Sequence, residues 1–338
     1  MILSAILLVL TGLLIAFAKA APGAVFSFIR PSPARRWARS ARSPRWCPSR
    51  CWEVLAAVLA LWFFYTLIRV FTKRRSLLRW LAGVLLGVSA GLFTFVGLWG
   101  LNHFGPSVGQ TLGLDVREYS KQELIAATAY YAAQANEYAA RVDRDADGKT
   151  VYPAFSELAA QAPAGYAALA ERYEQFTGAL DPVKPLASWR LFSQTGTTGI
   201  FVCFTAEACV NPDTYTAWIP YTMCHELAHR QAVAAEDDAN FCAYLACMAP
   251  AATIFAIPAP SARMSTATTP SPRSTRPPPA RSGRRCPTAS SPTCARRTNT
   301  TPSMRARCRT RRRRSTIPIS RPFPRNPASR ATAKPPIF

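Results

Sequence analysis

Histidine and acidic residues are the scarce components of this 338-residue sequence. Its ten cysteines include no Cys-x-x-Cys pair, which argues against a structural zinc ribbon. Asp and Glu are absent from residues 21–51 and 250–338, which hold seven and eighteen arginines. These segments account for the formal net charge of +23, because the rest carries 15 basic and 18 acidic residues. The basicity is therefore not that of a folded surface, and nucleic acid is not expected as a partner.

The two acid-free segments are expected to lack a packed fold. Residues 250–338 contain 17 of the 29 prolines and no apolar periodicity, so we predict a disordered Arg/Pro-rich tail. Residues 21–51 are predicted to be basic and irregular. A solvated tail and binding of anionic ligands through Arg311–Arg314 are alternatives. We favour a third interpretation, a reading-frame artefact, because such text is typical of a GC-rich gene translated out of frame.

Three uncharged or nearly uncharged stretches precede residue 102. Ile2–Ala18 predicts a transmembrane helix or a signal-like segment within residues 1–20. Val54–Phe71 and Trp80–Leu101 predict two transmembrane helices within residues 52–101. The last run has glycine at every fourth position, a stripe that would let another helix approach closely. We therefore expect a multi-pass protein whose partner is the lipid bilayer.

The basic residues between the second and third stretches indicate an orientation. Lys73, Arg74, Arg75 and Arg79 fill this short loop. The positive-inside rule places such a loop in the cytoplasm and the chain after Leu101 outside. The arginines of residues 30–50 favour the opposite orientation, but they fall in a segment interpreted as an artefact. We predict an extracytoplasmic domain over residues 102–249.

This domain is predicted to be mainly α-helical with a small β element. Ser120 and Glu123 form a capping box at the start of a helix that continues to Val142. Two further helices are expected over residues 155–161 and 165–176, and Thr198–Thr205 predicts a strand.

An acidic cluster in the same domain resembles the start of a calcium-binding loop. Asp143, Asp145, Asp147 and Gly148 match positions 1, 3, 5 and 6 of an EF-hand. Position 12 falls on Ala154, where a bidentate glutamate is required. We interpret the cluster as a solvated turn.

Residues 224–229 read Cys-His-Glu-Leu-Ala-His and contain an HExxH pattern. On a helix, His225 and His229 lie one turn apart on one face, where both imidazoles can bind one Zn²⁺. Glu226 beside them is placed to act as the general base on water. Pro220 suits the first turn of this helix, because it has no amide hydrogen to leave unpaired.

A catalytic zinc ion needs a third protein ligand. A second helix is predicted to begin at Glu236, with Asn240 and Tyr244 on the same face at intervals of four residues. The neighbouring acids Asp237 and Asp238 point in other directions, because successive helical residues are about 100° apart. We predict Glu236 as the third ligand, and Asn240 and Tyr244 as supporting or substrate contacts.

The pairing of HExxH with a downstream Glu-x-x-Ala-Asn resembles zincins of the gluzincin type, in which that glutamate binds zinc. More closely, the chain resembles a bacterial membrane family catalogued as domain of unknown function 3810, over about residues 52–248. The residues that carry this resemblance are Gly199-Ile200-Phe201, Glu207, Val210-Asn211, Pro220, His225-Glu226-Leu227-Ala228-His229, Glu236, Asn240-Phe241 and Ala243-Tyr244-Leu245, and more weakly Trp52-Glu53-Val54-Leu55 and Trp99-Gly100-Leu101-Asn102.

The resemblance implies a membrane anchor in a bacterial cell membrane followed by a zincin-like metallopeptidase domain. Two residues depart from the zincin pattern: Arg230 is charged, and Ala232 stands where the turn is expected to have glycine. The leading hypothesis is a membrane-anchored zinc-dependent peptidase acting on a peptide or protein substrate. The alternative is a non-catalytic membrane protein with a structural or vestigial metal site.

Overall fold

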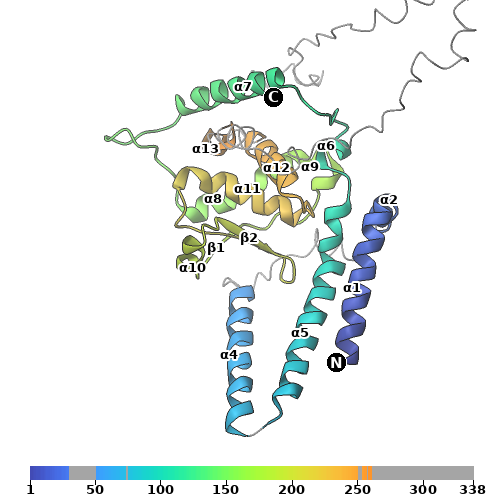
Figure 1. Cartoon of the computed structure of the whole chain (residues 1–338). Coiled ribbons are helices and arrows are strands. Elements are labelled where there is room, and N and C mark those ends of the chain that lie inside the picture. The colour runs from blue at the N-terminus through green and yellow to red at the C-terminus, as the bar shows by residue number, and fades with distance from the viewer. Residues whose placement is uncertain (30–50, 74, 250–252, 257, 261–338) are drawn as a thin grey trace, which may run out of the picture. The chain divides into compact units, whose positions relative to one another are not determined.

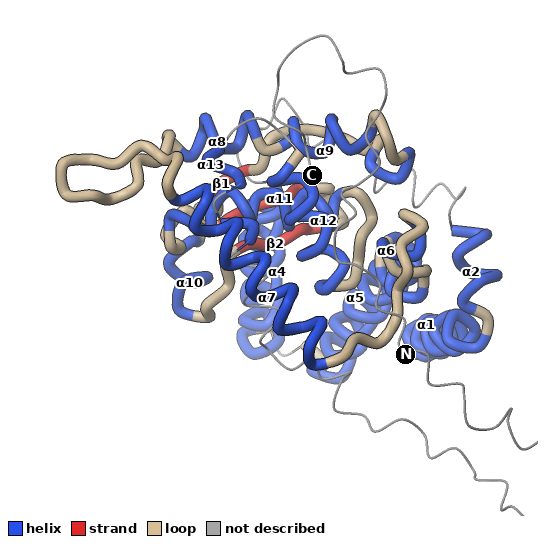
Figure 2. Tube along the Cα trace, turned by 90° about the horizontal axis from the view of Figure 1, so that it is seen from above, coloured by secondary structure: helices blue, strands red, loops and turns tan. Residues whose placement is uncertain are grey.

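The computed structural model describes residues 1–29, 51–73, 75–249, 253–256 and 258–260. All of them belong to one compact unit, Met1–Thr268. Apolar helices and a soluble domain make up this unit, and the domain is mainly helical with one small sheet (Figures 1 and 2). The predicted fold class is confirmed to this extent. The predictions for residues 30–50 and 261–338, including the reading-frame interpretation, lie outside the described residues.

Three helices are long and apolar enough to cross a membrane: α1 (Ile2–Ala20), α4 (Cys51–Thr72) and α5 (Leu77–Leu98). Each matches a predicted apolar stretch within three residues at either end. Both α1 and α4 pack against α5. The α4–α5 contact includes the rings of Phe63 and Trp80, whose centroids are 5.1 Å apart. Most side chains of these helices are exposed, as expected for surfaces that face lipid.

Two expectations for this region are corrected. Residues 22–29 form a helix, α2 (Pro22–Ile29), which packs against α1. Residues 24–29 lie in the acid-free segment, but they carry no charge and are mostly apolar, which favours this helix.

The glycine stripe Gly83, Gly87 and Gly91 faces open space, because a Cβ at any of them would have no neighbour within 4 Å. Within the described residues it mediates no helix contact.

The soluble domain is built from short helices around one longer pair. The capping box is confirmed, since Ser120 Oγ accepts from the Glu123 amide and Glu123 accepts from the Ser120 amide. The helices are α6 (Val108–Thr111), α7 (Lys121–Ala139), α8 (Phe155–Gln161), α9 (Pro163–Ala170), α10 (Trp189–Gln194), α11 (Ile219–Arg230), α12 (Glu236–Met248) and α13 (Thr253–Ala256), with 3-10 turns η1 (Gly100–Phe104), η2 (Glu174–Phe176) and η3 (Thr216–Trp218).

The acidic cluster before α8 forms a turn. Asp145 Oδ1 accepts hydrogen bonds from the amides of Asp147 and Lys149, at 3.0 and 2.8 Å. Gly148 has a φ of +77°, a conformation that favours glycine. The carboxylate of Asp145 thus stabilises the backbone of this turn.

The sheet has three strands in the order β1–β3–β2. The strands are β1 (Lys184–Pro185), β2 (Gly199–Val202) and β3 (Glu207–Val210), with β1 parallel and β2 antiparallel to β3. The predicted strand over residues 198–205 corresponds to β2 and the turn after it. We did not predict β3, which starts with a buried charge at Glu207.

Helices α11 and α12 lie side by side at the centre of the domain, between the sheet on α11 and α9 on α12. Gly165 of α9 permits that contact, because a Cβ there would collide with the carbonyl of Ala246. Phe255 and Ala259 are buried in the same core. The domain therefore continues beyond residue 249, the end that we predicted, because the apolar residues of α13 pack on α11 and α12.

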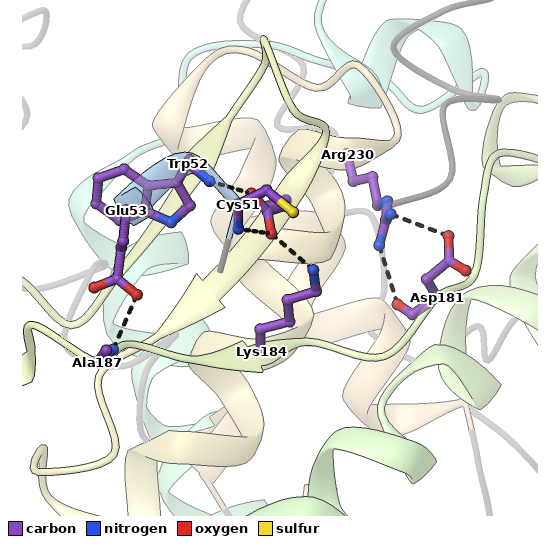
Figure 3. A network of polar contacts seen from close by, with 8 residues as sticks. Cys51, Trp52, Glu53, Asp181, Lys184, Ala187 and Arg230 are labelled. Carbon is purple, nitrogen blue, oxygen red and sulfur yellow. Dashed lines mark hydrogen bonds and ion pairs between the residues drawn. The ribbon is translucent and has the colours of Figure 1, made fainter. Parts of the chain in front are cut away.

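The start of α4 is fixed to the sheet by two glutamates. Glu207, with no exposed side-chain surface, accepts from the amides of Cys51 and Trp52, at 3.0 and 2.8 Å, and from Lys184 Nζ at 2.7 Å. Glu53 accepts from the amides of Ala187 and Ser188 (Figure 3). The apolar helix and the sheet therefore share a buried polar junction.

Candidate metal centre

Helix α11 carries the HExxH residues in the most buried part of the domain. Pro220 lies in its first turn, as predicted, and all but one of its twelve residues are buried. His225 and His229, one turn apart, face each other with ring centroids 4.8 Å apart. Their Nε2 atoms are 3.1 Å apart.

Both imidazoles are oriented through their other ring nitrogen. His229 Nδ1 lies 2.8 Å from the carbonyl of Val233, which can only accept, so Nδ1 carries the hydrogen. His225 Nδ1 lies 3.0 Å from Asn240 Oδ1. The Tyr221 hydroxyl donates to the backbone carbonyl of Asn240 at 2.9 Å. A neutral imidazole with its hydrogen on Nδ1 keeps Nε2 as an acceptor, and the two Nε2 atoms point at the same place.

Glu236, the first residue of α12, completes the cluster. Its carboxylate oxygens lie 3.2 Å from His225 Nε2 and 3.5 Å from His229 Nε2. One ligand atom from each residue lies within 4.8 Å of the others. Within the described part of the chain, this is the one such group of three or more His, Cys, Asp or Glu side chains. Asp237 and Asp238 are not part of it.

The turn between α11 and α12 brings Glu236 to the histidines. Ala232 adopts a φ of +65°, and its amide donates to the carbonyl of His229 at 2.9 Å. The amide of Val233 donates to the carbonyl of Ala228 at 3.2 Å. This left-handed turn explains why glycine is expected at position 232, where the chain has alanine.

Glu226 is buried against β2. Only 4% of the residue is exposed, and Oε2 has no hydrogen-bond partner among the described residues. Burial raises the pKa of this carboxyl to about 8, and the negative charge of Glu236 acts in the same direction. A buried carboxyl with one free oxygen beside two imidazoles is suited to exchange a proton with a molecule bound next to it.

The three residues of the cluster influence one another's charge. Burial opposes a charge on His225, but the hydrogen bond to Glu236 and the negative charges of Glu226 and Glu236 together outweigh it and raise the pKa of this imidazole. Burial and the neighbouring charge of His225 lower the pKa of His229. The hydrogen bond from His225 lowers the pKa of Glu236. The cluster thus holds an anionic carboxylate against two imidazoles that compete for one positive charge.

The cluster lines a cavity of about 590 Å³. All three histidines of the chain line this cavity, because His103 of η1 joins His225 and His229. From the sequence alone, the position of His103 at the end of the third apolar stretch indicates an interfacial polar residue and gives no sign of this proximity. The nearest signal is the family-like Trp99-Gly100-Leu101-Asn102 segment that directly precedes it. Trp99 also lines the cavity, and its ring contacts His229 edge-to-face, with centroids 6.2 Å apart.

The expected position of Tyr244 is wrong. Asn240 lines the cavity, but the Tyr244 hydroxyl donates to Gln134 of α7 at 3.1 Å and the residue does not line the cavity. Each interval of four residues advances a helix by about 40° beyond a full turn. Tyr244 is therefore about 80° away from Glu236 around α12, far enough to face α7.

Arg230, the charged residue that departs from the zincin pattern, does not line the cavity. It is fully buried and donates to the carboxylate of Asp181 at 3.0 Å and to its carbonyl at 3.1 Å (Figure 3). This ion pair holds the end of α11 against the segment before β1. The arginine at position 230 therefore has a packing role in this domain.

The fold and the site define a membrane protein with a helical domain that presents two histidines and a glutamate to a cavity. The chain belongs to the family described as Protein of unknown function (DUF3810), and the match covers residues 40–259. This confirms the predicted family and extends it past both predicted limits. No curated protein and no solved structure matches the chain.

Proposed function

We propose that the protein is a membrane-anchored zinc-dependent peptidase of the bacterial cell membrane, with zinc held by His225, His229 and Glu236. One observation carries the proposal. The Nε2 atoms of His225 and His229 lie next to each other and to the Glu236 carboxylate, while each Nδ1 lies within hydrogen-bond distance of an oxygen. Two imidazoles and one carboxylate are a donor set that zinc favours in catalytic sites.

The residues around this donor set fit peptide hydrolysis. Zinc bound there would supply Lewis acidity toward a carbonyl oxygen and lower the pKa of water. Glu226 would take a proton from water and deliver it to the amine nitrogen that leaves. A dication beside Glu226 favours its charged form, which counters the effect of burial on its pKa. Asn240 would hold His225 in its binding orientation.

The alternative of a non-catalytic protein with a structural or vestigial metal site has less support. Structural zinc sites are closed, with four protein ligands, whereas catalytic sites keep an open position. Here three side chains converge at the wall of a cavity, and the Glu236 side chain is 73% exposed. A free oxygen on buried Glu226 is also more useful in a reactive site than in a structural one.

The proposed topology is multi-pass with the soluble domain outside the cytoplasm. Lys73 and Arg75 lie in the loop that joins α4 to α5. The other end of α4 contacts the sheet, and the other end of α5 lines the cavity. A basic loop in the cytoplasm then places the cavity on the opposite face of the membrane. Protease treatment of intact cells should cleave the soluble domain. Full protection from the protease would show that the domain faces the cytoplasm.

The decisive test of the reaction uses the full-length, zinc-loaded protein and a randomised fluorogenic peptide library. Glu226→Gln keeps the shape of the side chain and should lower turnover by about 10²–10⁴-fold, the usual contribution of a general base. Asp237→Asn removes a nearby exposed carboxylate and should leave turnover unchanged. Equal turnover in Glu226→Gln, or no hydrolysis by zinc-loaded wild type, would favour the non-catalytic alternative.

A further inference from the structure

The candidate site is built partly from the end of a membrane-spanning helix. Phe95 and Trp99, at the end of α5, line the cavity. Trp99 is only 7% exposed, because it packs between Phe201 of β2 and the His229 ring, with centroids 5.1 and 6.2 Å away. The last turn of the apolar helix is therefore in direct contact with a residue of the proposed metal centre.

The strands beside the cavity are attached to the same end of the apolar helices. Phe204, in the turn between β2 and β3, is 45% exposed and lies 6.4 Å from the ring of Phe95. Glu207, the first residue of β3, binds the amides at the start of α4. Aromatic side chains in such positions are typical of the membrane–water interface. The cavity thus lies next to the end at which α5 would leave the bilayer.

Two aromatic residues connect the end of α5 with the cavity, since Phe95 and Trp99 both line it. Phe95 is 37% exposed within the span and lines the cavity as well. Trp99 lies about 6 Å further along the helix axis, a distance that an extended peptide covers in about two residues. A chain leaving the bilayer beside α5 would therefore reach the histidines within a few residues.

We propose that the substrate is a polypeptide anchored in the membrane, cleaved in the segment that directly follows its apolar anchor. This inference rests on the proposed peptidase function and names its substrate class. Anchoring in the same bilayer confines the substrate next to the cavity and raises its effective concentration. A lipid headgroup is the less suitable occupant, because β2, an edge strand of the sheet, lines the cavity and offers a backbone edge to an extended chain.

The test uses zinc-loaded full-length protein in phosphatidylcholine/phosphatidylglycerol vesicles. One probe is a polyleucine transmembrane peptide with a randomised 20-residue extension, and the matched control is the same extension without the anchor. At equal total concentration the anchored probe should be cleaved about tenfold faster or more. Mass spectrometry should place its cuts within about ten residues of the anchor, given an extended rise of about 3.3 Å per residue. Equal rates, or cuts spread evenly along the extension, would overturn the substrate class and leave the peptidase function intact.

A binding measurement separates the two proposals if no hydrolysis is found. In the Glu226→Gln background, a photo-reactive phenylalanine analogue replaces Phe204 in one variant and Val151, 51% exposed in the soluble domain, in the control. The analogue at position 204 should cross-link the anchored probe, and the analogue at position 151 should not. Cross-linking at position 204 without hydrolysis by wild type would support the membrane-tethered ligand and refute the peptidase. Equal cross-linking at both positions would refute the ligand class.

Discussion

The backbone of Gly199 lies directly against the carboxyl group of Glu226. A Cβ at position 199 would approach Glu226 Oε1 to 2.5 Å and Cγ to 2.8 Å. Gly199 begins β2, so the edge of the sheet fixes the position of the proposed general base. Glycine is therefore required at position 199 of the Gly199-Ile200-Phe201 segment, because the Glu226 side chain of α11 approaches its backbone closely.

Gly199→Ala should displace Glu226 without touching the two histidines. We expect zinc binding to be retained and turnover to fall by at least about tenfold, part of the loss expected on removing the base. Gly97→Ala is the matched control, because a Cβ there meets nothing within 4 Å. Turnover of Gly199→Ala equal to wild type would show that the contact does not position Glu226.

Ala232→Gly should relieve strain in the turn before Glu236. The φ of +65° costs an alanine about 1 kcal/mol relative to glycine, whereas glycine adds entropy to the unfolded chain. The thermal midpoint of unfolding in detergent should therefore stay the same or rise. Ala239→Gly, a change at a fully buried position inside α12, should lower it. An equal drop in both variants would contradict the strained turn.

Breaking the buried pair of Arg230 and Asp181 should lower stability strongly. Asp181→Ala leaves a fully buried guanidinium without its carboxylate, which should cost about 3–5 kcal/mol of unfolding free energy. Adding Arg230→Met should recover much of that loss, because it removes the unpaired charge. Chemical denaturation of the three proteins measures both effects. A double variant no more stable than Asp181→Ala would show that the charge is not the cause.

Glu207 should make the junction between α4 and the sheet sensitive to acid. Burial alone would raise the pKa of Glu207, but the bonds from Lys184 and the Trp52 amide lower it below the ordinary 4.5. A lowered folded-state pKa means that this carboxylate stabilises the fold above about pH 4.5 and stops doing so as the pH falls through that lowered value.

Unfolding midpoints between pH 7 and pH 3 test this junction. Glu207→Gln should be less stable than wild type at pH 7 and should lose less stability on acidification. Glu137→Gln removes an exposed carboxylate of α7 and serves as the control. An acid dependence in Glu207→Gln as steep as that of wild type would show that other groups are responsible.

The sequence predicts the local structure around the site well, because the signals are local. Pro220 and the HExxH spacing predict α11, and Ser120 and Glu123 predict the start of α7. The convergence of Glu236 with the histidines follows from a short turn and helical geometry. Each of these features depends on residues within one or two turns of each other.

The remaining features depend on contacts between distant segments. The partners of Glu207 lie 23 and 155 residues away in the chain, so its burial and β3 itself could not be inferred from the local pattern. His103 and Trp99 reach the cavity only because α5 packs on β2 and on the turn that follows α11. The prediction for Tyr244 fails because eight residues turn a helix about 80° beyond whole turns.

The most direct test of the proposed metal centre is the zinc content of the purified full-length protein. Wild type and the control Asp237→Ala should each hold about one zinc ion per chain, as a site with three protein ligands predicts. Glu236→Ala and His225→Ala should lose nearly all of it, measured by inductively coupled plasma mass spectrometry after dialysis against trace zinc. Full zinc occupancy in Glu236→Ala, or none in wild type, would contradict the assignment of His225, His229 and Glu236 as a zinc site.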